Sequence, residues 1–148
     1  MGRQMLSFDK LPLGPKERDL IQIASSLILK RGEYGRHHVA CALLTTADTC
    51  FSGLHISSNY GAGSICAEAV AIAESQRLGP NTLNRIVSVR HTFDSQQGIE
   101  IVPPCGSCRQ IILEYGPHAQ VILDVGLEPV LVPIEQLLPI PFCRRRAI

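Results

Sequence analysis

Cys66-Ala67-Glu68 and, further along the chain, Pro104-Cys105-Gly106-Ser107-Cys108 are the two stretches that decide the fold. In each stretch, a loop sequence is followed by apolar residues that recur with the period of a helix. Three cysteine thiolates suit Zn²⁺, and three protein ligands leave its fourth position open for water, as in catalytic sites. A structural zinc knuckle and a redox C-x-x-C are the alternatives, although the latter leaves Cys66 and Glu68 unexplained.

Length and composition indicate one domain over residues 1–148, with about 15 flexible residues at its N-terminus. Hydrophobic residues make up 45% of the chain, and the formal net charge is +1. This balance gives no electrostatic reason to expect nucleic-acid binding. The basic run at 144–146 is short enough to be a solvated tail.

The chain has no apolar stretch of about 18 residues, so no membrane span is expected. It also has no basic-then-apolar leader at its start, which predicts a cytoplasmic protein. Six cysteines in a reducing compartment, two of them in C-x-x-C spacing, favour metal binding over a disulfide framework.

Apolar periodicity predicts helices and strands in alternation. A helix follows Pro15 and ends before Gly32, with Leu20, Ile23 and Ala24 on its buried face. Further helices are expected at 66–77, with Ser64 as a candidate cap, from about 105, and at 134–138. Strands are expected at 39–45 and 50–56, joined as a hairpin, and at 85–91, 121–124 and 129–132. The fold class is therefore α/β, with three layers and a mixed sheet.

The helix starts bear on the chemistry of the cysteines. Three thiolates on Zn²⁺ leave a formal charge of −1, which N–H groups and helix dipoles aimed at the sulfurs offset. Arg109, next to Cys108, is a candidate cation near the sulfurs, and a surface arginine is its alternative. Glu68 can take a proton from zinc-activated water and pass it to a substrate. Its alternative is a surface glutamate stabilised by the helix dipole.

The order of these residues fits the zinc-deaminase pattern H-x-E, then P-C-x-x-C, in its all-cysteine form. The chain resembles the small, tetrameric-type cytidine deaminase family, which includes blasticidin S deaminase-like relatives. The likeness runs from about residue 17 to 142 and rests on four segments: YGRHHVACALLT at 34–45, FSGLHIS at 51–57, PCGSCRQ at 104–110, and LLP at 137–139 followed by Phe142. It implies a five-stranded mixed sheet in an α/β/α domain, a catalytic zinc held by Cys66, Cys105 and Cys108, hydrolytic removal of an exocyclic amine, and a homotetramer.

The resemblance also marks substrate contacts, and there the chain departs from the family. The family holds the ribose hydroxyls with Asn and Glu, where this chain has His55 and Ser57. His37 replaces a phenylalanine that packs near the pyrimidine. Ala67 and Phe142 complete the set of expected substrate contacts.

Two functions remain open for a catalytic site: deamination of cytidine, deoxycytidine or a modified cytosine nucleoside, and deamination of a nucleoside antibiotic such as blasticidin S or another aminated heterocycle. A non-catalytic ligand-binding protein on the same scaffold is a third possibility, although pure binding needs no proton shuttle at Glu68. Nucleic-acid editing is disfavoured by the charge balance.

Overall fold

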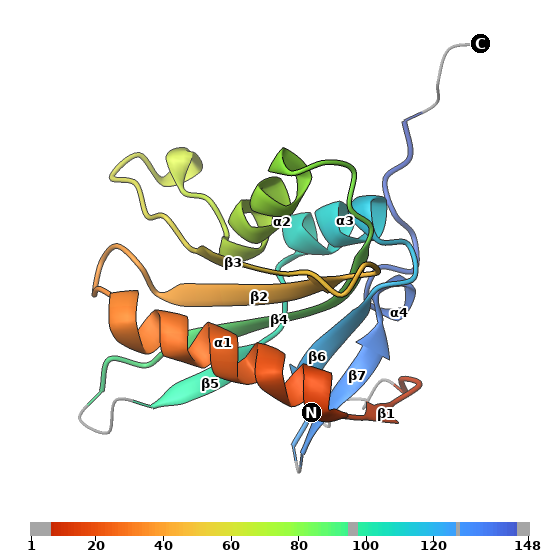
Figure 1. The fold of residues 1–148 in the computed structure, drawn as a ribbon. Helices are drawn as coiled ribbons and strands as arrows, with labels where there is room; N and C mark the ends of the chain where they lie inside the picture. The colour runs from red at the N-terminus through yellow and green to blue at the C-terminus, as the bar shows by residue number, and fades with distance from the viewer. Residues whose placement is uncertain (1–6, 95–97, 127, 145–148) are drawn as a thin grey trace, which may run out of the picture.

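Strand β2 (Val39–Thr45) is the centre of the fold because both of its faces are buried. Successive side chains of a strand point to opposite faces, and β2 contributes alternate residues to two cores. Ala40 and Ala42 pack in one core with helix α1 (Pro15–Arg31), whereas Cys41 and Leu43 pack in the other with helices α2 (Ala67–Arg77) and α3 (Gly106–Tyr115). In the computed structural model, which describes residues 7–94, 98–126 and 128–144, a sheet thus lies between two helical layers (Figure 1).

The sheet has seven strands in the order β1-β7-β6-β4-β2-β3, with β5 paired to β4 outside this path. The remaining strands are β1 (Leu11–Pro12), β3 (Cys50–Leu54), β4 (Leu83–His91), β5 (Ile99–Val102), β6 (Gln120–Asp124) and β7 (Pro129–Pro133). Strands β4 and β6 run parallel, and the other pairs are antiparallel. The sheet is mixed, as the sequence predicts.

The predicted number of strands, five, is wrong. The five predicted strands are present as β2, β3, β4, β6 and β7, and β1 and β5 are added to them. Strand β1 has only two residues, one of them a proline, and owes its existence to pairing with Leu131 and Val130 of β7. Strand β5 pairs with the second half of β4 (Ser88 to His91), while β6 pairs with the first half. Strand β1 is too short to show alternation, and β5 has a single polar residue, Glu100, before the proline pair. Pairing with β7 and β4 therefore defines these two strands.

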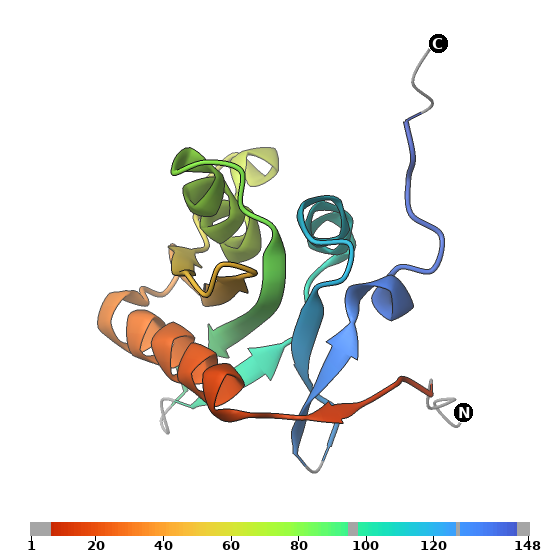
Figure 2. The ribbon, with the colours of Figure 1, turned by 45° about the vertical axis from the view of Figure 1, so that its right-hand side comes forward.

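The helical layers are unequal. Helix α1 covers one face of the sheet, and α2, α3 and the short α4 (Ile134–Leu137) cover the other (Figure 2). Leu20 and Ala24 of α1 are buried as expected, and Ile28 is buried with them, but Ile23, predicted on the same face, is 37% exposed. Within the described ranges, no helix combines the length and the apolar character needed to cross a membrane.

Close packing of β3 on α2 fixes the start of α2. A Cβ placed on Gly53 of β3 would lie 2.6 Å from the Ala71 nitrogen and 2.7 Å from the Ala67 oxygen, so only glycine allows this approach. The first turn of α2, which carries Glu68, is therefore held directly against the sheet.

Candidate active site

Three cysteine sulfurs meet at the N-termini of two neighbouring helices. Cys66 is the N-cap of α2, Cys105 is the N-cap of α3, and Cys108 lies in the first turn of α3. Their Sγ atoms all lie within 4.8 Å of one another, with Cys66 and Cys105 3.8 Å apart. Thiolates about 2.3 Å from a tetrahedral zinc are about 3.8 Å apart, so the three sulfurs fit this ion.

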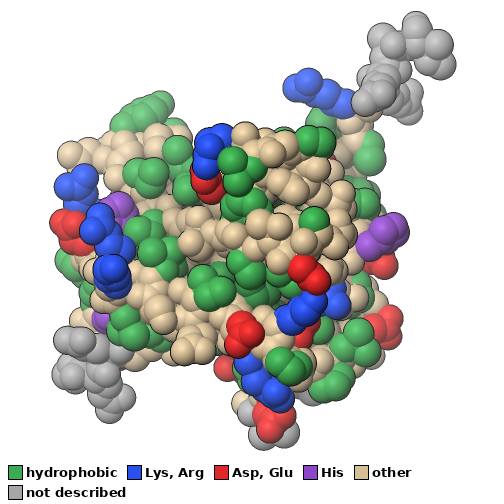
Figure 3. Space-filling view, in the orientation of Figure 1, with side chains coloured by type: hydrophobic (Ala, Val, Ile, Leu, Met, Phe, Trp, Pro, Cys, Tyr) green, Lys and Arg blue, Asp and Glu red, His purple; other side chains and the backbone are tan. Residues whose placement is uncertain are grey.

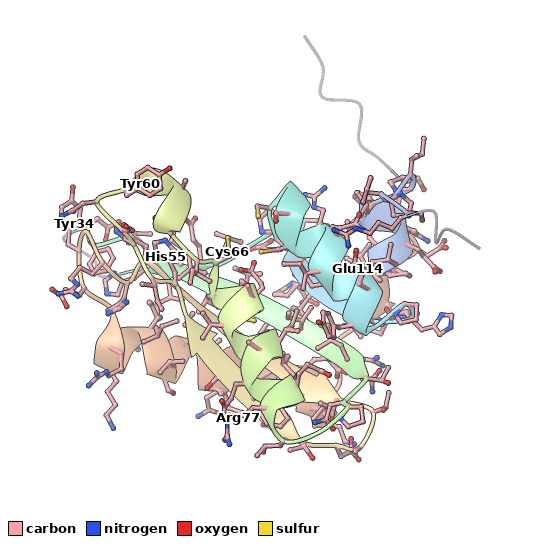
Figure 4. The ribbon with its side chains drawn as sticks, turned by 90° about the horizontal axis from the view of Figure 1, so that it is seen from above. Tyr34, His55, Tyr60, Cys66, Arg77 and Glu114 are labelled. Carbon is pink, nitrogen blue, oxygen red and sulfur yellow. The ribbon has the colours of Figure 1, made fainter. Side chains whose placement is uncertain are left out.

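No second group of three or more His, Cys, Asp or Glu side chains with this geometry occurs among residues 7–94, 98–126 and 128–144. Figure 4 looks down on α2 and α3 and shows Cys66 at the start of α2, while Arg77 and Glu114 lie at the opposite ends of the two helices. The positive ends of both helix dipoles therefore point to the sulfurs.

The three thiols differ in their surroundings. Burial raises the pKa of Cys66 and, together with the charge of Glu68, that of Cys108. Burial also opposes ionisation of Cys105, but hydrogen bonds from the Cys108 N–H and from the neighbouring thiols outweigh it and lower its pKa. The Cys108 N–H lies 3.5 Å from the Cys105 sulfur. Bound Zn²⁺ stabilises the thiolate form of its cysteine ligands.

Glu68 lies in the first turn of α2 and is 5% exposed. It lines a small internal space together with Ser88 of β4 and Pro104, the residue before Cys105. A surface glutamate, the alternative left open by the sequence, would be far more exposed. Its burial two residues after Cys66 is the arrangement expected of a carboxylate that works beside a metal.

Arg109 is half-buried and bonds to main-chain oxygens. Its Nε donates to Pro104 O at 2.9 Å and its Nη1 to Leu137 O at 3.2 Å. These bonds connect the loop before Cys105 to the end of α4. The guanidinium therefore fixes the position of the cysteine loop, and its electrostatic role toward the sulfurs remains a prediction.

The expected substrate contacts fall into two groups. His37, His55 and Ser57 are half-buried and lie together: His37 Nδ1 is 2.8 Å from His55 O, and the Ser57 N–H donates to Arg36 O at 3.0 Å. A bridge between Ile56 and Ile65, with N–O distances of 3.0 and 2.9 Å, attaches this segment to the residue before Cys66.

Ala67 is fully buried in the first turn of α2, whereas Phe142 is 71% exposed. Gln110, which the sequence did not single out, holds the Phe142 main chain by two hydrogen bonds of 2.8 and 2.9 Å. Ser64 does not cap α2. Its hydroxyl accepts from the Ser58 N–H at 3.1 Å, because the bridge at Ile65 leaves Ser64 in the preceding turn.

Comparison with known families agrees with this geometry. Residues 15–124 match the family described as the cytidine and deoxycytidylate deaminase zinc-binding region. The chain belongs to this family. It is an enzyme of the zinc-dependent deaminase class, with zinc as its metal.

Individual relatives extend the family likeness along most of the chain. A blasticidin-S deaminase from Bacillus cereus is 31% identical over 134 residues, covering 89% of this chain and 96% of that protein. A cytidine deaminase structure from Burkholderia pseudomallei superposes with a TM-score of 0.68 at 26% identity, covering 84% and 98%. One from Bacillus anthracis reaches 0.73 at 18% identity, covering 84% and 87%, and thereby supports the fold alone.

Proposed function

We propose that the protein catalyses the hydrolytic deamination of a cytosine-type nucleoside to the uracil-type product and ammonia. The observation that carries this proposal is the burial of Glu68 beside three converging cysteine sulfurs at two helix N-termini. Membership of the deaminase family gives the same reaction class.

Different residues of the chain have different roles in the proposed reaction. Cys66, Cys105 and Cys108 hold the zinc, which when bound lowers the pKa of a coordinated water toward neutrality. The Glu68 carboxylate accepts a proton from that water and delivers it to the ring nitrogen next to the amino group. Once the water oxygen has bonded to the ring carbon that carries the amine, Glu68 takes the second proton from the new hydroxyl group and gives it to the amine. The carbon–nitrogen bond then breaks, the carbonyl forms and the amine departs as ammonia. Its burial strengthens these charge interactions by excluding bulk water.

Two substrate classes fit the chain. Cytidine, deoxycytidine or a modified analogue is the first, and the family match supports it. A nucleoside antibiotic such as blasticidin S is the second, because the 31% identical relative is a blasticidin-S deaminase. The histidine and serine at positions 55 and 57 support a substrate whose sugar side differs from that of cytidine.

Two other classes of function have less support. A ligand-binding protein without turnover would gain nothing from a buried carboxylate beside the metal. Nucleic-acid binding finds no support in the surface charge: on the face drawn in Figure 3, Lys and Arg side chains lie beside Asp and Glu side chains. A continuous basic surface is the usual requirement for a nucleic-acid site.

A homotetramer in the cytoplasm completes the proposal. Large apolar side chains are exposed around the candidate site, with Tyr34 81%, Tyr60 76% and Phe142 71% exposed, and burial against further copies would remove them from water. All six cysteines are free thiols, which suits a reducing compartment. Sedimentation should give a species several times heavier than 16.2 kDa; a monomer at micromolar concentration would contradict the tetramer.

The test of the function is ammonia release by the purified zinc protein from cytidine, deoxycytidine, deoxycytidylate, cytosine, blasticidin S and, as a compound outside the class, adenosine. Turnover of at least one cytosine nucleoside, lost on zinc removal and restored by zinc, is the expected result. Ligand binding without ammonia from any cytosine compound would establish the non-catalytic alternative and contradict the proposal.

A further inference from the structure

Two of the three cysteine sulfurs lie close enough to react with each other. The Cys66 and Cys105 Sγ atoms are 3.8 Å apart, between the starts of α2 and α3, and the Cys108 Sγ lies within 4.8 Å of both. The sulfurs of a disulfide are about 2.05 Å apart, so the first pair needs to approach by less than about 2 Å. Rotation of the two side chains is enough for a movement of this size.

The three thiols differ in their access to solvent. Cys105 is exposed and Cys66 is partly exposed. Cys108 is 1% exposed and packs in the core with Ile112. An oxidant dissolved in water therefore reaches Cys105 first.

The backbone at the three cysteines also differs. Cys66 and Cys105 are N-caps in extended conformation, with ψ angles of 146° and 169°, so both side chains leave the chain before its first helical turn. Cys108 lies inside the first turn of α3. A bond between Cys66 and Cys105 leaves the core in place, whereas a bond to Cys108 draws a packed side chain out of it. Loss of that packing costs free energy.

We propose that Cys66 and Cys105 form a reversible oxidation site: after zinc is removed, a hydroperoxide converts the two thiols into a disulfide that joins α2 to α3 and prevents zinc from rebinding. The proposal goes beyond the proposed function and does not depend on the identity of the substrate. The C-x-x-C spacing alone indicates a different bond, between Cys105 and Cys108.

The reaction has two steps. The Cys105 thiolate attacks one oxygen of hydrogen peroxide, the O–O bond breaks, and the products are a sulfenic acid on Cys105 and, after protonation, one water. The Cys66 thiolate then attacks the Cys105 sulfur, the S–O bond breaks, and the oxygen leaves as a second water. The two thiols lose two electrons, which the peroxide gains. A dithiol reductant reverses the change by thiol–disulfide exchange.

The disulfide has a direct consequence for the metal. It removes two of the three thiolates that hold zinc, and one remaining thiolate cannot replace them. Bound zinc in turn occupies the sulfurs and should slow their oxidation. The disulfide also protects both cysteines from the sulfinic and sulfonic acids, which thiol reductants do not reverse. The site thereby makes zinc binding depend on the redox state of the surroundings.

The experiment treats the full-length protein, freed of zinc by a chelator, with hydrogen peroxide. Free thiols are then alkylated, and the disulfide is located by mass spectrometry of peptides. We expect a bond between Cys66 and Cys105 as the main product and zinc uptake at least about tenfold lower, restored by dithiothreitol. The matched control carries Cys50→Ser and Cys143→Ser, which remove two exposed thiols outside the group, and should behave as the wild type.

Two further variants identify the partner of Cys105. Cys108→Ser keeps the reacting pair and should form the same disulfide. Cys66→Ser removes the attacking thiol and should leave Cys105 as a sulfenic acid or a more oxidised form. In the zinc-loaded wild type the same bond should form at least about tenfold more slowly, with one zinc released per disulfide, measured with a chromogenic chelator.

A bond between Cys105 and Cys108 as the main product in the wild type would overturn the proposal. So would sulfinic or sulfonic acids without a disulfide, or oxidation confined to Cys50 and Cys143. Each of these results leaves the proposed function standing, because ammonia release by the zinc-loaded protein is measured separately. The mapping uses the wild type, so the result holds even if a variant fails to fold.

Discussion

The cysteine end of the candidate site and the sugar-side segment, as we name the residues that we propose to face the sugar of the substrate, are built in different ways. The cysteine end consists of two helix N-termini, where Cys66, Cys105 and Glu68 are placed by the start of a helix. The sugar-side segment, residues 55–57, follows the end of β3, and loops from elsewhere in the chain support it. The residues that the chain shares with the family therefore lie at the starts of helices, and the residues in which it departs from the family lie on a connection.

This difference has a physical reason. A metal site tolerates errors of only a few tenths of an ångström in its ligands, which helix starts packed on a sheet can provide. Substrate choice can change by replacing side chains on a loop without disturbing that geometry. Changes at the cysteine end should therefore abolish the reaction, whereas changes at the sugar-side segment should redirect it.

The largest effect is expected at the ligands. Cys108→Ala should reduce zinc from one per chain to near none and turnover to background, because two thiolates cannot replace three. Cys41→Ala is the matched control, since Cys41 is also a buried thiol but does not belong to the group of three sulfurs that lie within 4.8 Å of one another. Elemental analysis measures the zinc. Full retention of zinc in alanine variants of Cys66, Cys105 and Cys108 would show that these sulfurs are not the ligands.

The second effect is a change of substrate. The double substitution His55→Asn with Ser57→Glu restores the Asn and Glu that the resembling family has at these two positions. It should raise kcat/KM for cytidine by about one to two orders of magnitude, which corresponds to the free energy of one or two hydrogen bonds to a charged group. Turnover of the preferred substrate should fall in the same variant. If the wild type already turns over cytidine well above about 10⁵ M⁻¹s⁻¹, positions 55 and 57 do not set specificity.

The sequence predicted the cysteine end far better than the sugar-side segment, and the reason is locality. The starts of α2 and α3 could be predicted to within a few residues, because at each of them a loop pattern changes to a helical pattern. The spacing of the cysteines indicates a metal site. The orientation of His55 depends on the N–H of His38, 17 residues away in the chain, and the His38 ring in turn packs against Phe93, which has a positive φ. Strands β1 and β5 were missed for the same reason.

A third change should affect stability and neither half of the site. Glu17 accepts from the Gly14 N–H at 2.8 Å and from Arg85 at 3.0 Å. Burial opposes its ionisation, but the N–H groups of Glu17 and Gly14 and the Arg85 charge outweigh it and lower its pKa. Glu17→Gln should therefore cost about 1–2 kcal/mol of unfolding free energy near pH 7 and leave the substrate preference unchanged.

The pH dependence of that cost has a definite sign. A carboxylate with a lowered pKa stabilises the fold above its unfolded pKa, and the stabilisation is lost as the pH falls through its folded value. Denaturant titrations should show the difference between wild type and Glu17→Gln shrinking below about pH 4. Gln22→Glu, an exposed change on α1, should leave stability nearly unaltered. A constant difference down to pH 2 would contradict the ion pair.

The smallest effect is expected at the C-terminal segment. Gln110→Ala removes both hydrogen bonds to the Phe142 main chain and should raise KM a few-fold with kcat unchanged, if Phe142 contacts substrate in its own or a neighbouring copy. Glu114→Ala, which removes only the other partner of Gln110, is the control. Equal KM values in wild type and Gln110→Ala would remove Phe142 from the substrate contacts.

The central claim is that Glu68 moves the protons of a zinc-dependent deamination. The direct measurement is zinc content and ammonia release of Glu68→Gln on a confirmed substrate, beside Glu74→Gln from the exposed side of the same helix. The account predicts one zinc per chain in both variants, near wild-type turnover in Glu74→Gln, and a loss of at least about 10²-fold in Glu68→Gln. Near wild-type ammonia release by a zinc-loaded Glu68→Gln protein would contradict it.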